Sequence, residues 1–174
     1  WIDPTRNWVA TGRERHAATV REGNLPYPQR AIRTPEYLYI INFKPDRWPM
    51  GGPKTVTDVF TPPVDALENN TFVTFGDLDA SPTKAWIVQH RNDPQWKKYY
   101  DYAFAKRPHE ELYAIATDPD QMRNLANIPA MAMVKESLRE QLMQELRRTA
   151  DPRITGDGSL FDNHPYSSIP YEGY

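Results

Sequence analysis

The sequence predicts an α+β fold in which a small antiparallel sheet of three to four strands packs against one long C-terminal helix. Residues 107–150 suggest a short strand, a polar turn and an amphipathic helix in succession. Upstream, residues 30–34 and 36–43 are rich in the β-branched and aromatic residues that favour strands. Seventeen prolines among 174 residues, nearly twice the usual frequency, indicate few long elements and many irregular connections.

Composition bounds the class of protein. The length fits one domain that can bury a core. The net charge of −2 and the lack of any apolar run near 18 residues predict neither a nucleic-acid partner nor a membrane partner. The absence of cysteine excludes disulfides and a thiol nucleophile. Because the chain opens on Trp1 without a signal-peptide pattern, we expect it to begin inside a longer protein.

The first half of the chain predicts a hairpin followed by irregular structure. Residues 8–10 form a possible strand, and the Thr34-Pro35 step suits a turn between strands at 30–34 and 36–43. In the second of these strands Leu38 and Ile40 share one face, and Tyr37, Tyr39 and Ile41 share the other, so both faces should be at least partly covered. Residues 44–80 hold five prolines and a Gly-Gly pair, which predicts a Pro-rich meander.

Two short helices and a strand are expected next. Ser81-Pro82 is a typical N-cap and N1 pair for a helix that carries Ala85, Trp86 and Val88. The aromatic spacing within 95–105 predicts a second helix. Residues 111–117 then alternate as a strand that Asp118-Pro119-Asp120 would close as a turn, with a short helical turn over 122–126.

The long helix should begin near Asn127, as a cap, with Pro129 in its first turn and Asp151-Pro152 as its stop. Its apolar residues recur at steps of three or four, which predicts one buried stripe: Met131, Val134, Leu138, Leu142 and Leu146. The sequence thus suggests an α+β subdomain over 1–150 and an extended polar tail over 151–174.

Charged residues gather at one place, Thr11 to His16 (TGRERH). Its two guanidiniums could grip a sulfate, phosphate or carboxylate, although solvated loop charges are the simpler alternative. The pairs Asp77/Asp79 and Asp118/Asp120 could offer oxygen ligands to a hard cation, but turn chemistry accounts better for the second pair. The four histidines show no metal-ligand spacing, so we predict no metal ligands in this chain.

Two stretches resemble the sulfatase family. Residues 107–113 (RPHEELY) and 117–126 (TDPDQMRNLA) are similar to the "ELYD…DPxExxNLA" signature near the C-terminus of sulfatases. Upstream, GRERH and YPQRAIRTPEYLYIINFKPDRWP resemble the heparan N-sulfatase group and its bacterial relatives. The resemblance covers about residues 11–161, and it departs from the pattern at Ala114, where the family usually has Asp.

The resemblance implies the C-terminal subdomain of an alkaline-phosphatase-like hydrolase that cleaves sulfate esters or sulfamates of glycans. In that family a formylglycine, made from Cys or Ser in a C/S-x-P-x-R motif, attacks sulfur beside a divalent cation, usually calcium. Ser168 has Glu172 where the motif requires Arg, and there is no Cys. An N-terminal catalytic domain should therefore supply the formylglycine and the calcium ligands, leaving this chain inactive alone and without catalytic residues.

In relatives, the loop that matches TGRERH lies near the mouth of the active-site pocket. The resemblance therefore implies that Arg13, Glu14, Arg15 and His16 contact the sulfated glycan substrate. By family habit the protein should be exported to the periplasm or the cell exterior. Two alternatives stay open: a stand-alone binding or scaffold module that uses its aromatic loops, and a phosphodiesterase-type relative. The sequence upstream of Trp1 would separate the first of these from the sulfatase interpretation.

Overall fold

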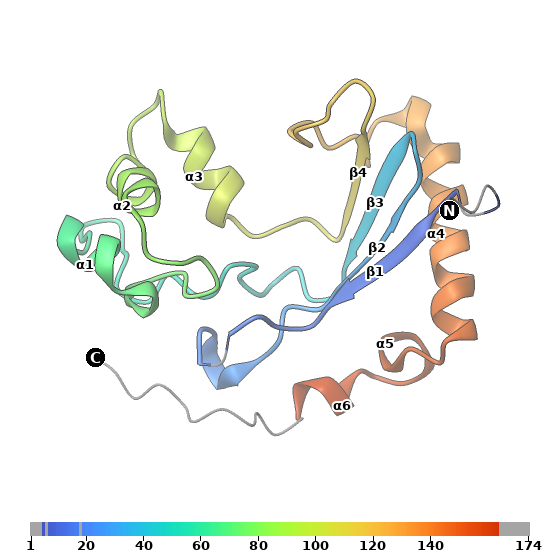
Figure 1. Cartoon of the computed structure of the whole chain (residues 1–174), viewed down its shortest axis with the longest axis horizontal. Coiled ribbons are helices and arrows are strands. Elements are labelled where there is room, and N and C mark those ends of the chain that lie inside the picture. Colours follow the sequence, from blue (N-terminus) through green and yellow to red (C-terminus); the bar gives the residue numbers. More distant parts are fainter. Residues whose placement is uncertain (1–4, 6, 18, 164–174) are drawn as a thin grey trace. The chain divides into compact units, whose positions relative to one another are not determined.

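The computed structural model describes residues 5, 7–17 and 19–163 (Figure 1). Their contacts divide them into two compact units. The sheet unit comprises the described residues within 1–14, 27–44 and 108–163, and the helical unit comprises those within 15–26 and 45–107. The structure thus does not follow the single boundary at residue 150 that the sequence suggests.

The sheet unit contains a four-stranded antiparallel sheet in the order β1-β2-β3-β4. This agrees with the predicted small antiparallel sheet of three to four strands. The turn between β2 and β3 is confirmed, because Thr34 N donates to Tyr37 O at 2.8 Å. Central pairing aligns Ile32 with Tyr39 and Tyr39 with Leu112. The strands are β1 (Val9–Arg13), β2 (Gln29–Arg33), β3 (Tyr37–Asn42) and β4 (Glu110–Ala114).

The prediction that Thr11 to Arg13 belong to a loop is wrong, because they continue β1. Gly12 explains the error. A glycine usually marks a turn, but a Cβ at this strand position would lie only 2.8 Å from Cδ of Arg30. Gly12 therefore serves the close approach of the Arg30 side chain from the neighbouring strand.

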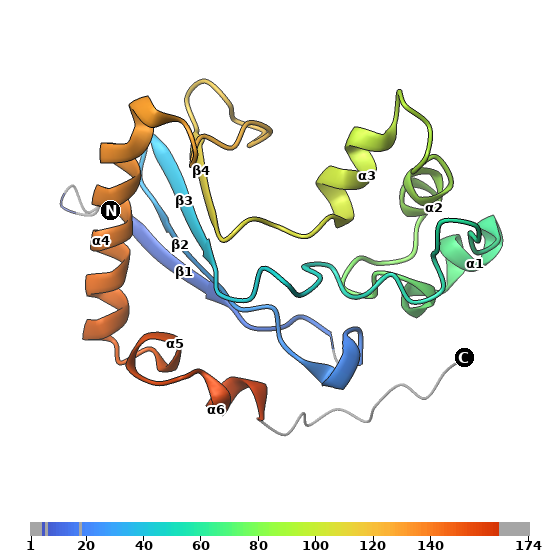
Figure 2. The same cartoon turned by 180° about the vertical axis from the view of Figure 1, so that it is seen from behind.

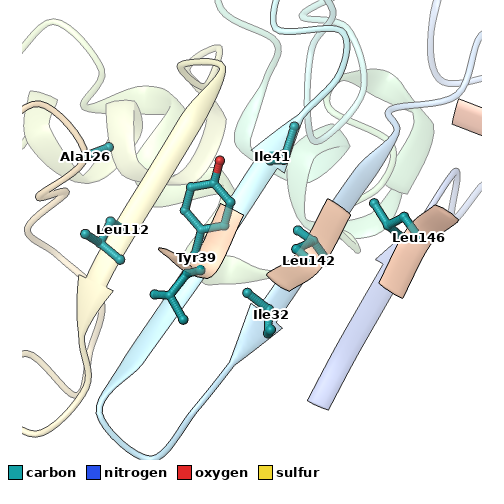
Figure 3. Packing of buried hydrophobic residues seen from close by; sticks show 8 residues of the cluster. Ile32, Tyr39, Ile41, Leu112, Ala126, Leu142 and Leu146 are labelled. Carbon is teal, nitrogen blue, oxygen red and sulfur yellow. The ribbon is translucent and has the colours of Figure 1, made fainter. Parts of the chain in front are cut away.

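Helix α4 (Ala132–Arg148) runs along the sheet, as Figures 1 and 2 show from opposite sides. The expected apolar stripe is confirmed, since Leu138, Leu142 and Leu146 are buried on the helix. Figure 3 shows Leu142 and Leu146 among the apolar side chains of the sheet. The buried cluster also contains Ile32, Tyr39, Ile41, Leu112 and Ala126. Burial of this stripe fixes the helix on one face of the sheet.

The segment before α4 differs from the prediction. Residues 122–126 are not helical, and the long helix begins at Ala132 after a 3₁₀ turn, η3 (Pro129–Met131), without a cap at Asn127. The cause lies in Asn124, whose Oδ1 accepts from Leu112 N at 3.0 Å. Its Nδ2 donates to the carbonyl oxygen of Glu110 at 3.2 Å, and Leu125 N donates to Leu112 O at 2.7 Å. This segment is therefore held extended along β4.

Asp118 acts in a turn, as the sequence predicts. Its two carboxylate oxygens accept from the amides of Met122 and Arg123 at 3.0 and 2.8 Å. Its own amide donates to Ala114 O at 2.8 Å, which ends β4. The carboxylate is thus occupied by backbone amides.

After α4 the chain does not run as an extended tail over residues 151–163. It forms two short helices, α5 (Pro152–Thr155) and α6 (Ser159–Asp162). Asp151 caps α5, because its Oδ1 accepts from Arg153 N at 2.8 Å. The rest of the predicted tail, 164–174, lies outside the described residues.

The helical unit confirms both short helices, with Ser81 Oγ accepting from Lys84 N at 3.1 Å as the predicted cap. The sequence does not predict α1 (Val64–Asn69) within the Pro-rich meander, because Pro62 and Pro63 come directly before it. In the core Phe75 stacks on Phe104 with ring centroids 4.2 Å apart. The elements are η1 (Glu22–Asn24), α1 (Val64–Asn69), η2 (Thr71–Val73), α2 (Pro82–Gln89) and α3 (Lys97–Phe104).

Lys84 on α2 is fully buried, and its Nζ bridges three carbonyl oxygens. It donates to Thr71 O, Phe75 O and Leu78 O at 3.0, 3.3 and 2.7 Å. Burial lowers the pKa of this amine from 10.5 to about 8. The group is therefore protonated at neutral pH, when its three hydrogens match three acceptors.

We expect Lys84→Met to lower the free energy of unfolding by about 1–3 kcal/mol at pH 7, because three buried carbonyls lose their donor. Between about pH 8 and pH 10 the unfolded chain holds the Lys84 proton more tightly than the folded chain does, so this group makes stability rise with pH. Urea denaturation at pH 7.5 and 9.5 should show the deficit of Lys84→Met widening at the higher pH. A deficit that narrows would contradict the lowered pKa.

Candidate functional site

The four residues predicted to bind substrate are divided between the two units. Arg13 is the last residue of β1 and pairs with Gln29 of β2, and Glu14 follows it in the sheet unit. Arg15 and His16 belong to the helical unit. Two of the four predicted residues therefore belong to each unit, in different local surroundings.

Glu14 lies in a buried ion network with Arg30, Asp151, Arg153 and Asp162. Its Oε1 accepts from Arg30 Nη2 at 2.8 Å, and its Oε2 accepts from Arg153 Nη2 at 2.7 Å. Arg30 also donates to Asp151 Oδ2 at 2.6 Å, and Arg153 donates to Asp162 Oδ1 at 2.7 Å. Each guanidinium thus bridges two carboxylates, one of which is Glu14.

The guanidiniums of this network are nearly inaccessible, with side-chain exposures of 7% for Arg30 and 2% for Arg153. Burial works against the charged form of each, but hydrogen bonds to the carboxylates outweigh it and raise the pKa of both. The network joins β1 and β2 to the segment that follows α4. Since Glu14 carries both bridges, its first role is to position the end of β1.

A cavity of about 380 Å³ adjoins this network in the sheet unit. The half-buried Arg13 and Glu14 both line it, and the Glu14 carboxylate is already bonded to Arg30 and Arg153. Among its lining residues are Thr11, Arg13, Glu14, Arg30, Thr149 and Asp151.

In the helical unit, His16 lies beside a buried carboxylate. Its side chain is 63% exposed, and its Nδ1 lies 3.8 Å from Asp77 Oδ1. Asp77 also accepts from Ala17 N at 2.9 Å and forms an ion pair with the buried Arg21. The backbone next to His16 is therefore held by the Asp77 carboxylate. The imidazole itself faces solvent and can donate a hydrogen bond to a ligand or accept one from it.

A larger cavity, of about 730 Å³, lies in the helical unit and is lined by none of the four predicted residues. It includes one indole and several charged side chains. Sequence reasoning missed it, because its lining is divided between the Pro-rich meander, residues 19–25 and Lys106, which are distant in the sequence. The side chains that give it chemical character are Glu22, Asp46, Arg47, Trp48, Lys54 and Lys106.

Calcium, which the family resemblance implies, does not fit the carboxylates weighed for it in this chain. Asp77 is paired with Arg21, and Asp118 accepts from two amides. In the part of the chain that the structure describes, no group of three or more His, Cys, Asp or Glu is arranged to hold a metal ion. Nor does any helix there have the length and apolarity needed to cross a membrane.

Known proteins were compared with the chain at two levels. The sequence matches no protein-family model, and it matches none of the curated proteins.

Proposed function

We propose that this chain is the C-terminal subdomain of a sulfatase that hydrolyses sulfate esters or sulfamates of glycans. A catalytic domain N-terminal to it would carry the formylglycine and calcium, and the protein would be exported. In this proposal the chain supplies substrate contacts and a packed scaffold, and the reacting atoms belong to the other domain.

The observation that carries the proposal is the way the C-terminal signature folds. Its ELY residues form β4, its Asp118 closes the turn, and its Asn124 returns to bond the edge of β4. Residues that are far apart in the pattern thus satisfy one another locally, which gives a physical reason for their order and spacing.

Within the TGRERH motif we assign different roles to Glu14 and to His16. Glu14 is held by two buried arginines, which suits it to positioning. His16 is exposed, with its Nδ1 3.8 Å from Asp77 Oδ1, which suits it to contact with a sugar or sulfate oxygen. Arg15 directly precedes it, and the family resemblance implies that this residue also contacts the substrate. We therefore assign the substrate contacts chiefly to Arg15 and His16.

The test is kinetic and uses the full-length protein with a sulfated disaccharide as substrate. We expect Arg15→Ala and His16→Ala each to lower kcat/KM by tenfold or more, because each removes a hydrogen bond to the substrate. Sulfate release measured by ion chromatography gives the rate. Matched controls are Arg147→Ala and His109→Ala, which change exposed residues outside both cavities and should leave the kinetics unaltered.

Three other outcomes separate the alternatives. Turnover of a phosphate diester in preference to the sulfated disaccharide would identify a phosphodiesterase-type relative. Glycan binding without any turnover would favour a binding module. Active enzyme whose Arg15→Ala and His16→Ala variants match the controls would remove these residues from the substrate site while leaving the sulfatase assignment in place.

A further inference from the structure

The larger cavity of the helical unit has the features of a ligand site. Its volume of about 730 Å³ falls in the range of small-molecule pockets. Its lining combines apolar surface from Leu25, Trp48 and Pro53 with charged side chains at its rim. Such a mixture suits a ligand that has both a hydrophobic face and polar substituents.

The indole of Trp48 packs against Phe75. Its ring meets Phe75 edge to face, with centroids 6.2 Å apart and an interplanar angle of 64°. The backbone carbonyl oxygen of Trp48 accepts a hydrogen bond from Arg21 Nε at 2.6 Å. Because the charge of Arg21 is compensated by Asp77, Arg21 holds the Trp48 backbone in place but adds little to the charge of the cavity.

Cations reach the cavity from separate segments of the chain. Lys106 follows α3, and its Nζ lies 5.2 Å from the centroid of the Trp48 ring. Lys54, in the meander, donates to Phe72 O at 3.1 Å and is exposed. Arg47, next to Trp48, donates to Pro26 O at 2.9 Å. The two lysines line the same cavity as Trp48, and their charges favour a ligand that carries negative charge.

Two carboxylates, those of Glu22 and Asp46, also line the cavity and limit the choice of anion. They would repel a polyphosphate, whereas they can accept hydrogen bonds from hydroxyl groups. A saccharide ring with one acidic substituent matches these groups: its C–H face suits Trp48, its acid suits the lysines, and its hydroxyls suit the carboxylates.

We propose that this cavity binds an acidic sugar, through a carboxylate or a sulfate, with Trp48 as its platform and Lys54 and Lys106 as its anion contacts. The site is distinct from the TGRERH residues, none of which lines it. The proposal stands independently of sulfatase activity, because binding needs no turnover.

Isothermal titration calorimetry of the full chain tests it, with digalacturonate and a sulfated chondroitin disaccharide as separate probes. Digalacturonate carries no sulfate that a sulfatase could hydrolyse, so its binding can be measured without turnover. We expect at least one of the two acids to bind, and Lys54→Gln and Lys106→Gln each to weaken it by about tenfold. Trp48→Phe, which keeps an aromatic ring against Phe75, should weaken binding several-fold.

The matched control is Lys98→Gln. Lys98 is also an exposed lysine of the helical unit over an aromatic ring, with Nζ 4.9 Å from the Tyr99 centroid, but it does not line the cavity. The proposal is overturned if neither acid binds, if neutral cellobiose binds as well as the acids, or if ATP binds more tightly. It is also overturned if Lys54→Gln and Lys106→Gln behave like Lys98→Gln.

Discussion

Replacing Leu142 by alanine should lower the free energy of unfolding by about 2–5 kcal/mol. Leu142 is fully buried at the centre of the α4 stripe, and it packs in the cluster that contains Ile32, Tyr39 and Leu112 (Figure 3). The truncation removes buried apolar contact and leaves a cavity that the surrounding strands cannot fully close. Urea denaturation followed by circular dichroism should show a lower midpoint with little change in slope.

The control is Met133→Ala on the same helix. Met133 is 87% exposed, so its truncation should change stability by less than about 0.5 kcal/mol. If Leu142→Ala and Met133→Ala cost the same, α4 is not held to the sheet by its apolar stripe.

Replacing Arg30 by methionine should lower the free energy of unfolding by about 3–5 kcal/mol. The change keeps much of the side-chain volume but removes the charge that faces Asp151 and Glu14, whose carboxylates are themselves 13% and 18% exposed. Two poorly solvated carboxylates would then lose a shared partner. Equilibrium unfolding at low ionic strength measures the effect.

Arg33→Met provides the comparison, since Arg33 is exposed on the same strand. Adding Asp151→Asn to Arg30→Met should recover part of the loss, because it removes one of the carboxylates left without its partner. A cost below about 1 kcal/mol for Arg30→Met would mean that the network contributes little to the stability of the sheet unit.

Local patterns in the sequence predict much of the sheet unit. The alternation in β3, the Thr34-Pro35 turn and the α4 stripe each depend on neighbours within a few positions, so they can be found without the fold. Asp118 is predictable for the same reason. The start of α4 is not, because Asn124 bonds to β4, twelve or more positions away, instead of supporting a helical turn.

The candidate sites are less accessible to sequence reasoning. The TGRERH motif shows where charge gathers, but the partners of Glu14 lie up to 139 positions away. The Asp151-Pro152 step is readable as a helix stop, whereas its ion pair with Arg30 needs the fold. In the helical unit, Trp48 and Lys106 are brought together by tertiary packing across a segment whose prolines hide the helix α1.

The bonds made by Asn124 and Leu125 have a consequence for assembly. Along β4 the carbonyl of Glu110 and both backbone groups of Leu112 are taken up by these two residues, and the carbonyl of Ala114 accepts from Asp118. Another polypeptide strand therefore cannot pair with β4 through these backbone groups. Any growth of this sheet by strand addition, whether from a second domain or from another copy of the chain, must begin at the opposite border, β1.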